Sequence, residues 1–175
     1  MKKAIFLDRD GTIVEDSGYA HKIEDLKLLP NSIKGLKLLK DFKLFIATNQ
    51  SGIGRGIYTF QDFANINNHL LKEFKKDSIK IEKIYFCPHK PEDNCECRKP
   101  KTKLLKEAEK EFKLDLKESF AIGDKKSDIE LGKNAGCKTI LVLTGNGTQA
   151  KKEINADFVA KDLLDAAKWI IKKFK

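Results

Sequence analysis

The sequence is short of arginine and cysteine, and it lacks any long apolar segment. Of its 175 residues 35 are basic, yet only Arg9, Arg55 and Arg98 are arginine, and cysteine and proline occur four times each. The apolar run nearest the amino terminus, residues 4–7, is too short for the core of a signal peptide or for a membrane span. We therefore expect a cytoplasmic protein with no membrane partner.

The sequence also lacks internal repeats, low-complexity linkers and any insertion long enough to fold separately. Apolar residues make up 41% of the chain and include eleven Phe, which is enough to close one hydrophobic core. We expect a single domain over residues 1–175, with a monomer as the default state.

The formal net charge of +9 raises the question of nucleic-acid binding, because basic surfaces release counterions when they bind phosphate backbones. The lysines are spread along the chain instead of forming one block, which is typical of a solvated surface. We therefore expect no nucleic-acid partner. The three arginines lie in or beside the motifs below, where a guanidinium suits forked contacts with phosphate or carboxylate.

Short apolar runs alternate with helical patterns along the chain. Continuous apolar runs suit strands buried on both faces of a parallel sheet. Predicted strands cover residues 4–7, 44–47, 81–86, 120–122, 139–143 and, more weakly, 157–159. Apolar residues at three-to-four spacing predict helices around residues 33–39, 60–74, 104–112 and 163–174. This alternation predicts a doubly wound α/β sandwich with right-handed crossovers.

Polar clusters follow four of these predicted strands. They are Asp8, Thr48-Asn49, Cys87 with His89, and Gly123-Asp124. Ligands of open parallel sheets bind at the carboxyl ends of the strands, where the loops converge. We expect the four clusters to meet at one edge of the sheet.

The first cluster, Asp8-Arg9-Asp10-Gly11, places two carboxylates one residue apart. If the chain turns sharply at Gly11, both carboxylates reach one site, where one attacks and the other moves protons. The pattern alone is weak, because a surface loop of this composition is common. The apolar strand before Asp8 and a second acidic cluster at residues 123–128 strengthen it.

A second constellation consists of Cys87, His89, Cys95 and Cys97. Three thiolates and one imidazole within eleven residues satisfy a closed tetrahedral Zn²⁺ site, which leaves no open position for catalysis. We predict a structural zinc in a loop over residues 87–97, with a redox cluster or free thiols as the alternative. The metal would order the loop and direct the following residues, Arg98 and Lys99, towards a phosphate.

Four short motifs, in order along the chain, resemble those of the haloacid dehalogenase (HAD) superfamily of phosphatases. They are Asp8-x-Asp10-Gly11-Thr12, Thr48-Asn49, Lys99, and Gly123-Asp124-xxx-Asp128. The resemblance runs through the whole chain. It implies a HAD-like, Rossmann-type fold of the α/β class: a doubly wound, mainly parallel sheet in three layers, with no separate cap domain.

The resemblance also implies roles for single residues. Asp8 would attack phosphorus and form an aspartyl-phosphate, while Asp10 would serve as general acid and then as general base. Thr48 would hold the phosphoryl group, and Lys99, with Arg98 beside it, would neutralise its charge.

A catalytic Mg²⁺ belongs to the same resemblance. Oxygen ligands from Asp8, the main-chain carbonyl of Asp10 and Asp124 would suffice for this ion, which keeps several waters. Asp128 is expected to position a lysine instead of binding the metal.

Longer stretches, at residues 6–13, 17–21, 48–56 and 97–100, are similar to the branch of heptose-bisphosphate phosphatases and histidinol phosphatases. The heptose-bisphosphate enzymes are the better match, which implies a small phosphorylated sugar as substrate and a place in heptose synthesis, for example for lipopolysaccharide. One departure is a shorter span between His89 and Cys95. The implied substrate-binding residues are Asp16, Ser17, Gly18, Tyr19, Thr48, Asn49, Gln50, Ser51, Arg55, Arg98, Lys99 and Lys125.

Three interpretations stay open at this point: a sugar-bisphosphate phosphatase, a histidinol-phosphate phosphatase, and a zinc-stabilised nucleic-acid module or DNA-end phosphatase. Of the smaller signals, His69 is expected to be solvated and Cys137 to be a packed core thiol. His21 falls in the expected substrate loop without a defined role.

Overall fold

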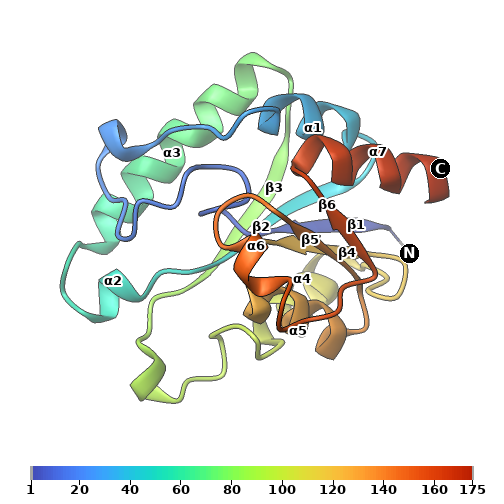
Figure 1. Ribbon diagram of the computed structural model, residues 1–175. Coiled ribbons are helices and arrows are strands. Elements are labelled where there is room, and N and C mark those ends of the chain that lie inside the picture. The colour runs from blue at the N-terminus through green and yellow to red at the C-terminus, as the bar shows by residue number, and fades with distance from the viewer. Residues whose placement is uncertain (1, 175) are drawn as a thin grey trace.

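The computed structural model describes residues 2–174, which are arranged around one six-stranded sheet (Figure 1). Each strand pairs in parallel with its neighbours, and the strand order is β3-β2-β1-β4-β5-β6. The strands are β1 (Ala4–Leu7), β2 (Lys43–Asn49), β3 (Ile81–Cys87), β4 (Phe120–Gly123), β5 (Lys138–Val142) and β6 (Phe158–Ala160).

Helices cover both faces of the sheet (Figure 1). One face carries α1 (Ser32–Leu38), α3 (Phe60–Lys76) and α7 (Leu163–Phe174), and the other carries α4 (Lys103–Phe112) and α5 (Lys126–Ala135). Short helical segments in the connections are η1 (Ile23–Asp25), α2 (Ser51–Gly54), η2 (Pro91–Asp93) and α6 (Gly147–Ala150). The predicted three-layer α/β fold is confirmed. No helix within residues 2–174 has the length and apolar character needed to cross a bilayer.

The central strand β1 packs against both helix layers. Ile5 and Leu7 contribute to the core under α1, α3 and α7, whereas Ala4 and Phe6 contribute to the core under α4 and α5. All four side chains are at most 2% exposed. Burial on both faces requires a continuous apolar run instead of an alternating one, which is the pattern that the sequence shows.

The strand order reverses at β1. The chain first runs outward from β1 to β2 and β3, and it later returns to the other side of β1 with β4, β5 and β6. Such a reversal opens a crevice beyond the carboxyl ends of the two strands that flank it, and open α/β sheets bind ligands there. Asp8 follows β1 and Asp124 follows β4. The topology therefore brings two acidic loops to one crevice.

Five of the six strands differ from their predicted bounds by one or two residues, and β2 and β3 gain polar residues at their carboxyl ends. β2 includes Thr48 and Asn49, and β3 includes Cys87, because the two strands continue to pair up to Asn49 and Cys87. These polar residues end the strands instead of following them, but they still lie at the expected edge of the sheet.

The sequence pattern did not predict helix α5. Its buried face combines Ile129 and Leu131 with Asp128, Gly132 and Ala135. A face with so few large apolar residues produces a weak helical signal. Gly132 lies where a Cβ would be 2.7 Å from side-chain atoms of the sheet, so the small residue permits close packing of this helix on the strands.

Gly35 permits a second close approach, between α1 and α7. A Cβ atom at position 35 would lie 2.8 Å from the main-chain carbonyl group of Leu163. Because this neighbour is backbone, it cannot rotate out of the way, and the two helices would have to separate.

We expect Gly35→Ala to lower the free energy of unfolding by about 1–3 kcal/mol, although alanine is normally preferred over glycine inside helices. Urea unfolding would measure the change. The control is Lys34→Ala on the exposed side of the same helix, which should stay within about 0.5 kcal/mol of the parent protein. A Gly35→Ala variant as stable as the parent would contradict the close packing of these helices.

Candidate active site

The loop after β1 brings Asp8 and Gly11 against Asp124. The main-chain N–H of Asp8 donates to Ile122 O at 2.9 Å, which ties the loop to β4. Gly11 has φ +88°, and a side chain there would overlap the Asp124 carboxylate. Glycine is therefore required both by the backbone conformation and by the close approach of the two acidic loops.

The ammonium group of Lys99 lies at the centre of this crevice. Its Nζ atom is 2.8 Å from Asp8 Oδ1 and 2.7 Å from Asp128 Oδ1, and it donates to Ala47 O at 2.9 Å. Burial alone would lower the pKa of Lys99, but the carboxylates of Asp128 and Asp8 outweigh it and raise the pKa above its usual value. The expectation that Asp128 positions a lysine is confirmed.

The main chain of Lys99 is fixed as well. Its N–H donates to Asn49 Oδ1 at 3.1 Å, and its carbonyl accepts from Asn49 Nδ2 at 3.4 Å. One side-chain amide at the end of β2 therefore holds both polar groups of the lysine backbone. This pairing connects the sheet to the loop that carries Arg98 and Lys99.

Asp124 is fully buried beside Asp8. Its Oδ2 atom accepts from the main-chain N–H of Asn146 at 2.7 Å, while its Oδ1 atom has no hydrogen-bond partner among residues 2–174. Burial, together with the charge of Asp8, raises the pKa of Asp124 to about 7.

The carboxylates of Asp8, Asp124 and Asp128 place one oxygen each within 4.8 Å of one another. Lys99 contacts one oxygen of Asp128 and one oxygen of Asp8, which leaves the second oxygen of Asp8 and the unpartnered Oδ1 atom of Asp124 as candidate ligands. Two carboxylates in this arrangement repel unless a cation lies between them, and oxygen ligands suit Mg²⁺. These residues therefore fit the predicted magnesium ion.

Asp10 has different partners from Asp8, which contacts Lys99. Its carboxylate accepts from Arg9 Nε at 3.1 Å and from Gln50 Nε2 at 2.9 Å. Burial raises the pKa of Asp10, Arg9 partly offsets this effect, and Asp8 adds to the rise. A carboxyl group with a raised pKa beside a polar pocket is suited to giving and accepting protons.

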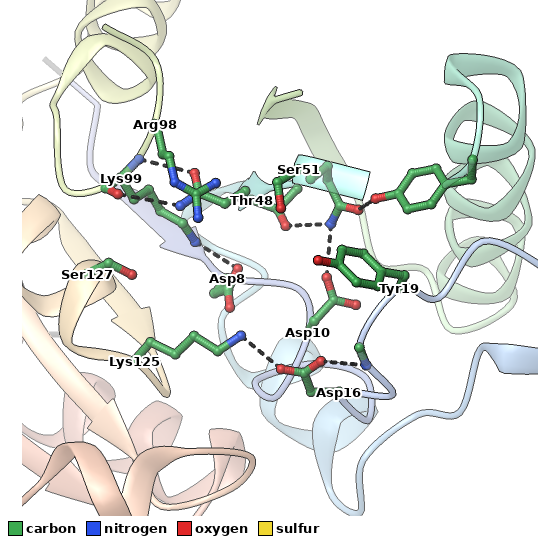
Figure 2. Close-up of a pocket in the computed structure, with 14 residues that line it drawn as sticks. Asp8, Asp10, Asp16, Tyr19, Thr48, Ser51, Arg98, Lys99, Lys125 and Ser127 are labelled. Atoms are coloured by element: carbon green, nitrogen blue, oxygen red, sulfur yellow. Dashed lines mark hydrogen bonds and ion pairs between the residues drawn. The ribbon is translucent and has the colours of Figure 1, made fainter. Parts of the chain in front are cut away.

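Asp8, Asp10 and Lys99 line the floor of a pocket of about 370 Å³ (Figure 2). In Figure 2 the side chain of Lys99 points at Asp8. Lys125 closes one wall, where its Nζ atom pairs with Asp16 Oδ2 at 2.8 Å. The lining residues are Asp8, Asp10, Asp16, Gly18, Tyr19, Thr48, Asn49, Gln50, Ser51, Tyr58, Arg98, Lys99, Lys125 and Ser127.

The lining includes the predicted catalytic and substrate-binding residues except Ser17 and Arg55, and the predicted metal ligand Asp124 is fully buried outside the lining. Ser17 is exposed in the loop beside the pocket, and the guanidinium of Arg55 lies 3.6 Å from Glu92 Oε1, outside the lining. Two lining residues were missed. Tyr58 belongs to no recognised motif, and Ser127 is one of the unspecified positions between Asp124 and Asp128, so only the folded chain brings them to the pocket.

Three residues gave weaker signals in the sequence, namely His69, Cys137 and His21. His69 is partly exposed on α3 and lies 3.9 Å from Glu73, as expected of a solvated histidine, and Cys137 is buried in the core. His21, which had no defined role, stacks on Tyr58 with ring centroids 5.6 Å apart.

The cysteine and histidine side chains of the 87–97 loop converge. The Sγ atom of Cys87 is 2.7 Å from that of Cys97 and 3.4 Å from that of Cys95, and His89 Nδ1 is 3.2 Å from Cys97 Sγ. All four ligand atoms lie within 4.8 Å of one another. Because none of these cysteines forms a disulfide, three thiol groups and one imidazole are available to one ion, and the set fits Zn²⁺.

The same loop carries Arg98 to the pocket. The Arg98 NH1 atom donates to the carbonyl of His89 at 3.3 Å, so its side chain is held by the loop that contains the cluster. Figure 2 shows Arg98 on the same side of the pocket as Lys99 and Thr48.

Comparison with known proteins identifies a matching family model and several similar phosphatases. A family model described as HAD-hydrolase-like matches residues 96–166. A D-glycero-alpha-D-manno-heptose-1,7-bisphosphate 7-phosphatase of Campylobacter jejuni is 47% identical over 86% of each chain. The corresponding beta-named 7-phosphatase of Helicobacter pylori is 43% identical over 96% of this chain and 97% of the relative.

A solved structure gives the same result at the level of the fold. The D,D-heptose 1,7-bisphosphate phosphatase of B. bronchiseptica, complexed with magnesium and phosphate, is 30% identical and superposes with a TM-score of 0.93. The match covers 98% of this chain and 99% of that one.

The parallel sheet, the acidic crevice at its switch point and the matching family model define the class as HAD-like hydrolases. Because the two relatives are 47% and 43% identical to this chain and the matches cover most of it, the chain belongs to the family of D-glycero-D-manno-heptose-1,7-bisphosphate 7-phosphatases.

The raised pKa of Asp124 predicts how stability depends on pH. A carboxyl group with its pKa raised from 3.8 to about 7 stabilises the folded state fully below pH about 4, and this contribution is lost as the pH rises through about 7. In EDTA, stability should therefore fall between these pH values, and Asp124→Asn should remove part of the fall, because the pKa values of the buried Asp128 and Asp10 are raised as well.

Thermal unfolding from pH 4.5 to 8 would measure both curves. Added Mg²⁺ should restore the stability of the parent protein near neutral pH, because the ion binds the folded state, but it should restore little in Asp124→Asn. Parallel pH curves for the two proteins in EDTA would contradict this account.

Proposed function

We propose that this protein, acting as a single catalytic domain, removes the 7-phosphate of D-glycero-D-manno-heptose 1,7-bisphosphate. The observation that carries the proposal is the buried Lys99, which contacts Asp8 at the floor of a polar, cation-lined pocket. The names of relatives with similar length and 38–47% identity support the substrate.

The first half of the reaction transfers the phosphoryl group to the protein. An oxygen of Asp8 forms a bond to phosphorus while the bond from phosphorus to the sugar oxygen breaks, which gives an aspartyl-phosphate. Asp10 gives its proton to the departing oxygen. Lys99 neutralises charge on the phosphoryl oxygens, and the hydroxyl of Thr48 donates to them.

The second half regenerates the protein. Asp10, now ionised, takes a proton from water, and the oxygen of that water attacks the phosphorus atom of the aspartyl-phosphate. The bond between phosphorus and Asp8 breaks, and inorganic phosphate leaves. Asp10 is suited to both steps because burial raises its pKa while Arg9 and Gln50 stabilise its ionised form.

The two metal ions have separate places in this proposal. Mg²⁺ would be held by Asp8, Asp124 and the main-chain carbonyl of Asp10, and it would supply charge neutralisation and orientation of the phosphoryl group. Zn²⁺ would be held by the cysteine and histidine cluster, where it would order the loop that ends in Arg98 and Lys99.

The outer part of the pocket would bind the rest of the sugar. Arg98 and Lys125 bring positive charge to the lining, while Asp16 and Tyr19 offer partners for hydroxyl groups. Ser17 and Arg55 remain predicted substrate residues with less support, because neither lines the pocket. We further propose that the protein acts as a monomer in the cytoplasm, with this small sugar and not nucleic acid as its partner.

Replacement of Asp8 tests the chemistry. We expect Asp8→Asn to lower the turnover rate by at least about 10³-fold, because the amide cannot act as the nucleophile. Phosphate release from heptose 1,7-bisphosphate in the presence of Mg²⁺ is the measurement. Asp77→Asn, which removes a carboxylate from an exposed ion pair with Lys37, is the control and should retain normal turnover.

The substrate is tested by kcat/KM values for both anomers of heptose 1,7-bisphosphate and for histidinol phosphate, measured side by side. We expect a clear preference for a heptose bisphosphate. A preference for histidinol phosphate would overturn the proposed substrate while leaving the chemistry intact.

Replacement of one cysteine tests the zinc site. Cys95→Ser should lower both the zinc content, measured by atomic absorption, and the melting temperature, because one of four ligands is lost. Cys137→Ala removes a buried thiol outside the cluster and should keep one zinc ion per chain. Full zinc content in Cys95→Ser would exclude this residue as a ligand.

A further inference from the structure

Gln50 lies at the carboxyl end of β2, is 4% exposed, and makes four hydrogen bonds through one side-chain amide. Its Oε1 atom accepts from Arg9 NH2 at 3.2 Å and from the Tyr58 hydroxyl at 2.6 Å. Its Nε2 atom donates to Asp10 Oδ2 and to Thr48 Oγ1, both at 2.9 Å. An amide has four hydrogen-bonding positions, and here all four are occupied by the protein.

Arg9 determines which way the amide faces. A guanidinium has only donors, so the Gln50 atom that faces it has to be the oxygen. Arg9 itself is 1% exposed and is held by Asn67 Oδ1 at 3.2 Å and by Asp10. The nitrogen of Gln50 therefore has to face Asp10 and Thr48.

This orientation has a consequence for the Thr48 hydroxyl. The oxygen accepts a hydrogen bond from Gln50, so its own single hydrogen remains free to be donated elsewhere. Thr48 lines the pocket with Asp8, and a phosphoryl group bound there would be the acceptor. On the other side, the same amide and Arg9 hold the carboxylate of Asp10 from two directions.

We propose that Gln50 is a positioning residue for phosphoryl transfer. Locked by Arg9 and Tyr58, its amide directs the hydrogen of Thr48 towards the phosphate and fixes the carboxylate of Asp10. The sequence resemblance implied that Gln50 binds substrate, but its amide has no position left for a ligand. The inference rests on the proposed function of Thr48 and Asp10.

The decisive variant is Gln50→Glu. A carboxylate of the same shape still accepts from Arg9 and Tyr58, but it has no N–H group to donate, so the Thr48 hydroxyl would turn its hydrogen towards the new carboxylate. We expect kcat/KM to fall by about 10²-fold. Both heptose 1,7-bisphosphate and p-nitrophenyl phosphate should lose activity, because both present the same phosphoryl group to Thr48, and the sugar should lose more, because its departing oxygen needs the proton of Asp10.

A matched control and a double variant isolate the role. Gln61→Glu makes the same change on the exposed first turn of α3 and should leave kcat/KM unchanged. Thr48→Val removes the hydroxyl that Gln50 is proposed to direct. The double variant of Gln50→Glu and Thr48→Val should lose at least about tenfold less activity than the product of the two single losses, because the two side chains act together.

Tyr58→Phe provides a graded second test. It removes one of the two donors to the Gln50 oxygen, while Arg9 still holds the amide, so the loss in kcat/KM should be only about 2–10-fold. A greater loss in Tyr58→Phe than in Gln50→Glu would overturn the proposed role of Arg9 in orienting the amide.

Titration with inorganic phosphate in the presence of Mg²⁺ separates this inference from the proposed function. Gln50→Glu and Thr48→Val should each weaken phosphate binding by about tenfold, whether or not the sugar is turned over. If the parent protein hydrolysed neither substrate, the proposed function would fail and this titration would still decide the role of Gln50. Losses that multiply in the double variant, or that affect the sugar substrate alone, would show that Gln50 contacts substrate instead.

Discussion

The ion pairs of Lys99 are the contacts on which the rest of the site depends. Its ammonium group is 5% exposed or less, and it lies between the carboxylates of Asp8 and Asp128. A buried charge is costly to desolvate, and removing one partner leaves the others uncompensated. The position of Asp8 is therefore linked to α5, which carries Asp128, and to the loop that carries Lys99.

The sheet explains how these groups meet. The reversal of strand order places the loops after β1 and β4 side by side, and Gly11 allows them to touch. Asn49, at the end of β2, then attaches the main chain of Lys99 to the same edge. Strands β1, β2 and β4 thus each hold one part of the site, and Arg98 is held by its hydrogen bond to the carbonyl of His89 in the loop that contains the cysteine and histidine cluster.

Much of this arrangement could be predicted from the sequence, because it follows from general rules of parallel sheets. Continuous apolar runs identified the strands, and the rule that loops converge at their carboxyl ends placed Asp8, Thr48 and Asp124 together. Two results required the structure. Tyr58 lies in a connection without a motif, and α5 has too few large apolar residues to produce a clear helical pattern.

Arg55 is a predicted substrate residue that lies outside the pocket lining. It lies within a stretch that resembles the family, and a scarce arginine beside a motif suggested a phosphate contact, but its side chain pairs with Glu92 outside the pocket. Proximity in sequence to a motif does not determine the direction of a side chain. Gln50 is a second example. Its position in a motif suggested a contact with substrate, but all four hydrogen bonds of its side chain are made within the protein.

The charge of the whole chain and the charge of the pocket floor have opposite signs. The protein carries a formal net charge of +9, whereas the buried cluster sets the carboxylates of Asp8, Asp124 and Asp128 against the single ammonium of Lys99. At physiological ionic strength, attraction between exposed charges is largely screened beyond about 8 Å, so the effect of the surface lysines on an approaching anion depends on the salt concentration. The surface lysines can raise the rate at which an anion associates with the protein, whereas the charged groups at the pocket floor determine how tightly it is bound. The association rate and the affinity of the pocket for an anion therefore depend on different residues, and a substitution can change one without the other.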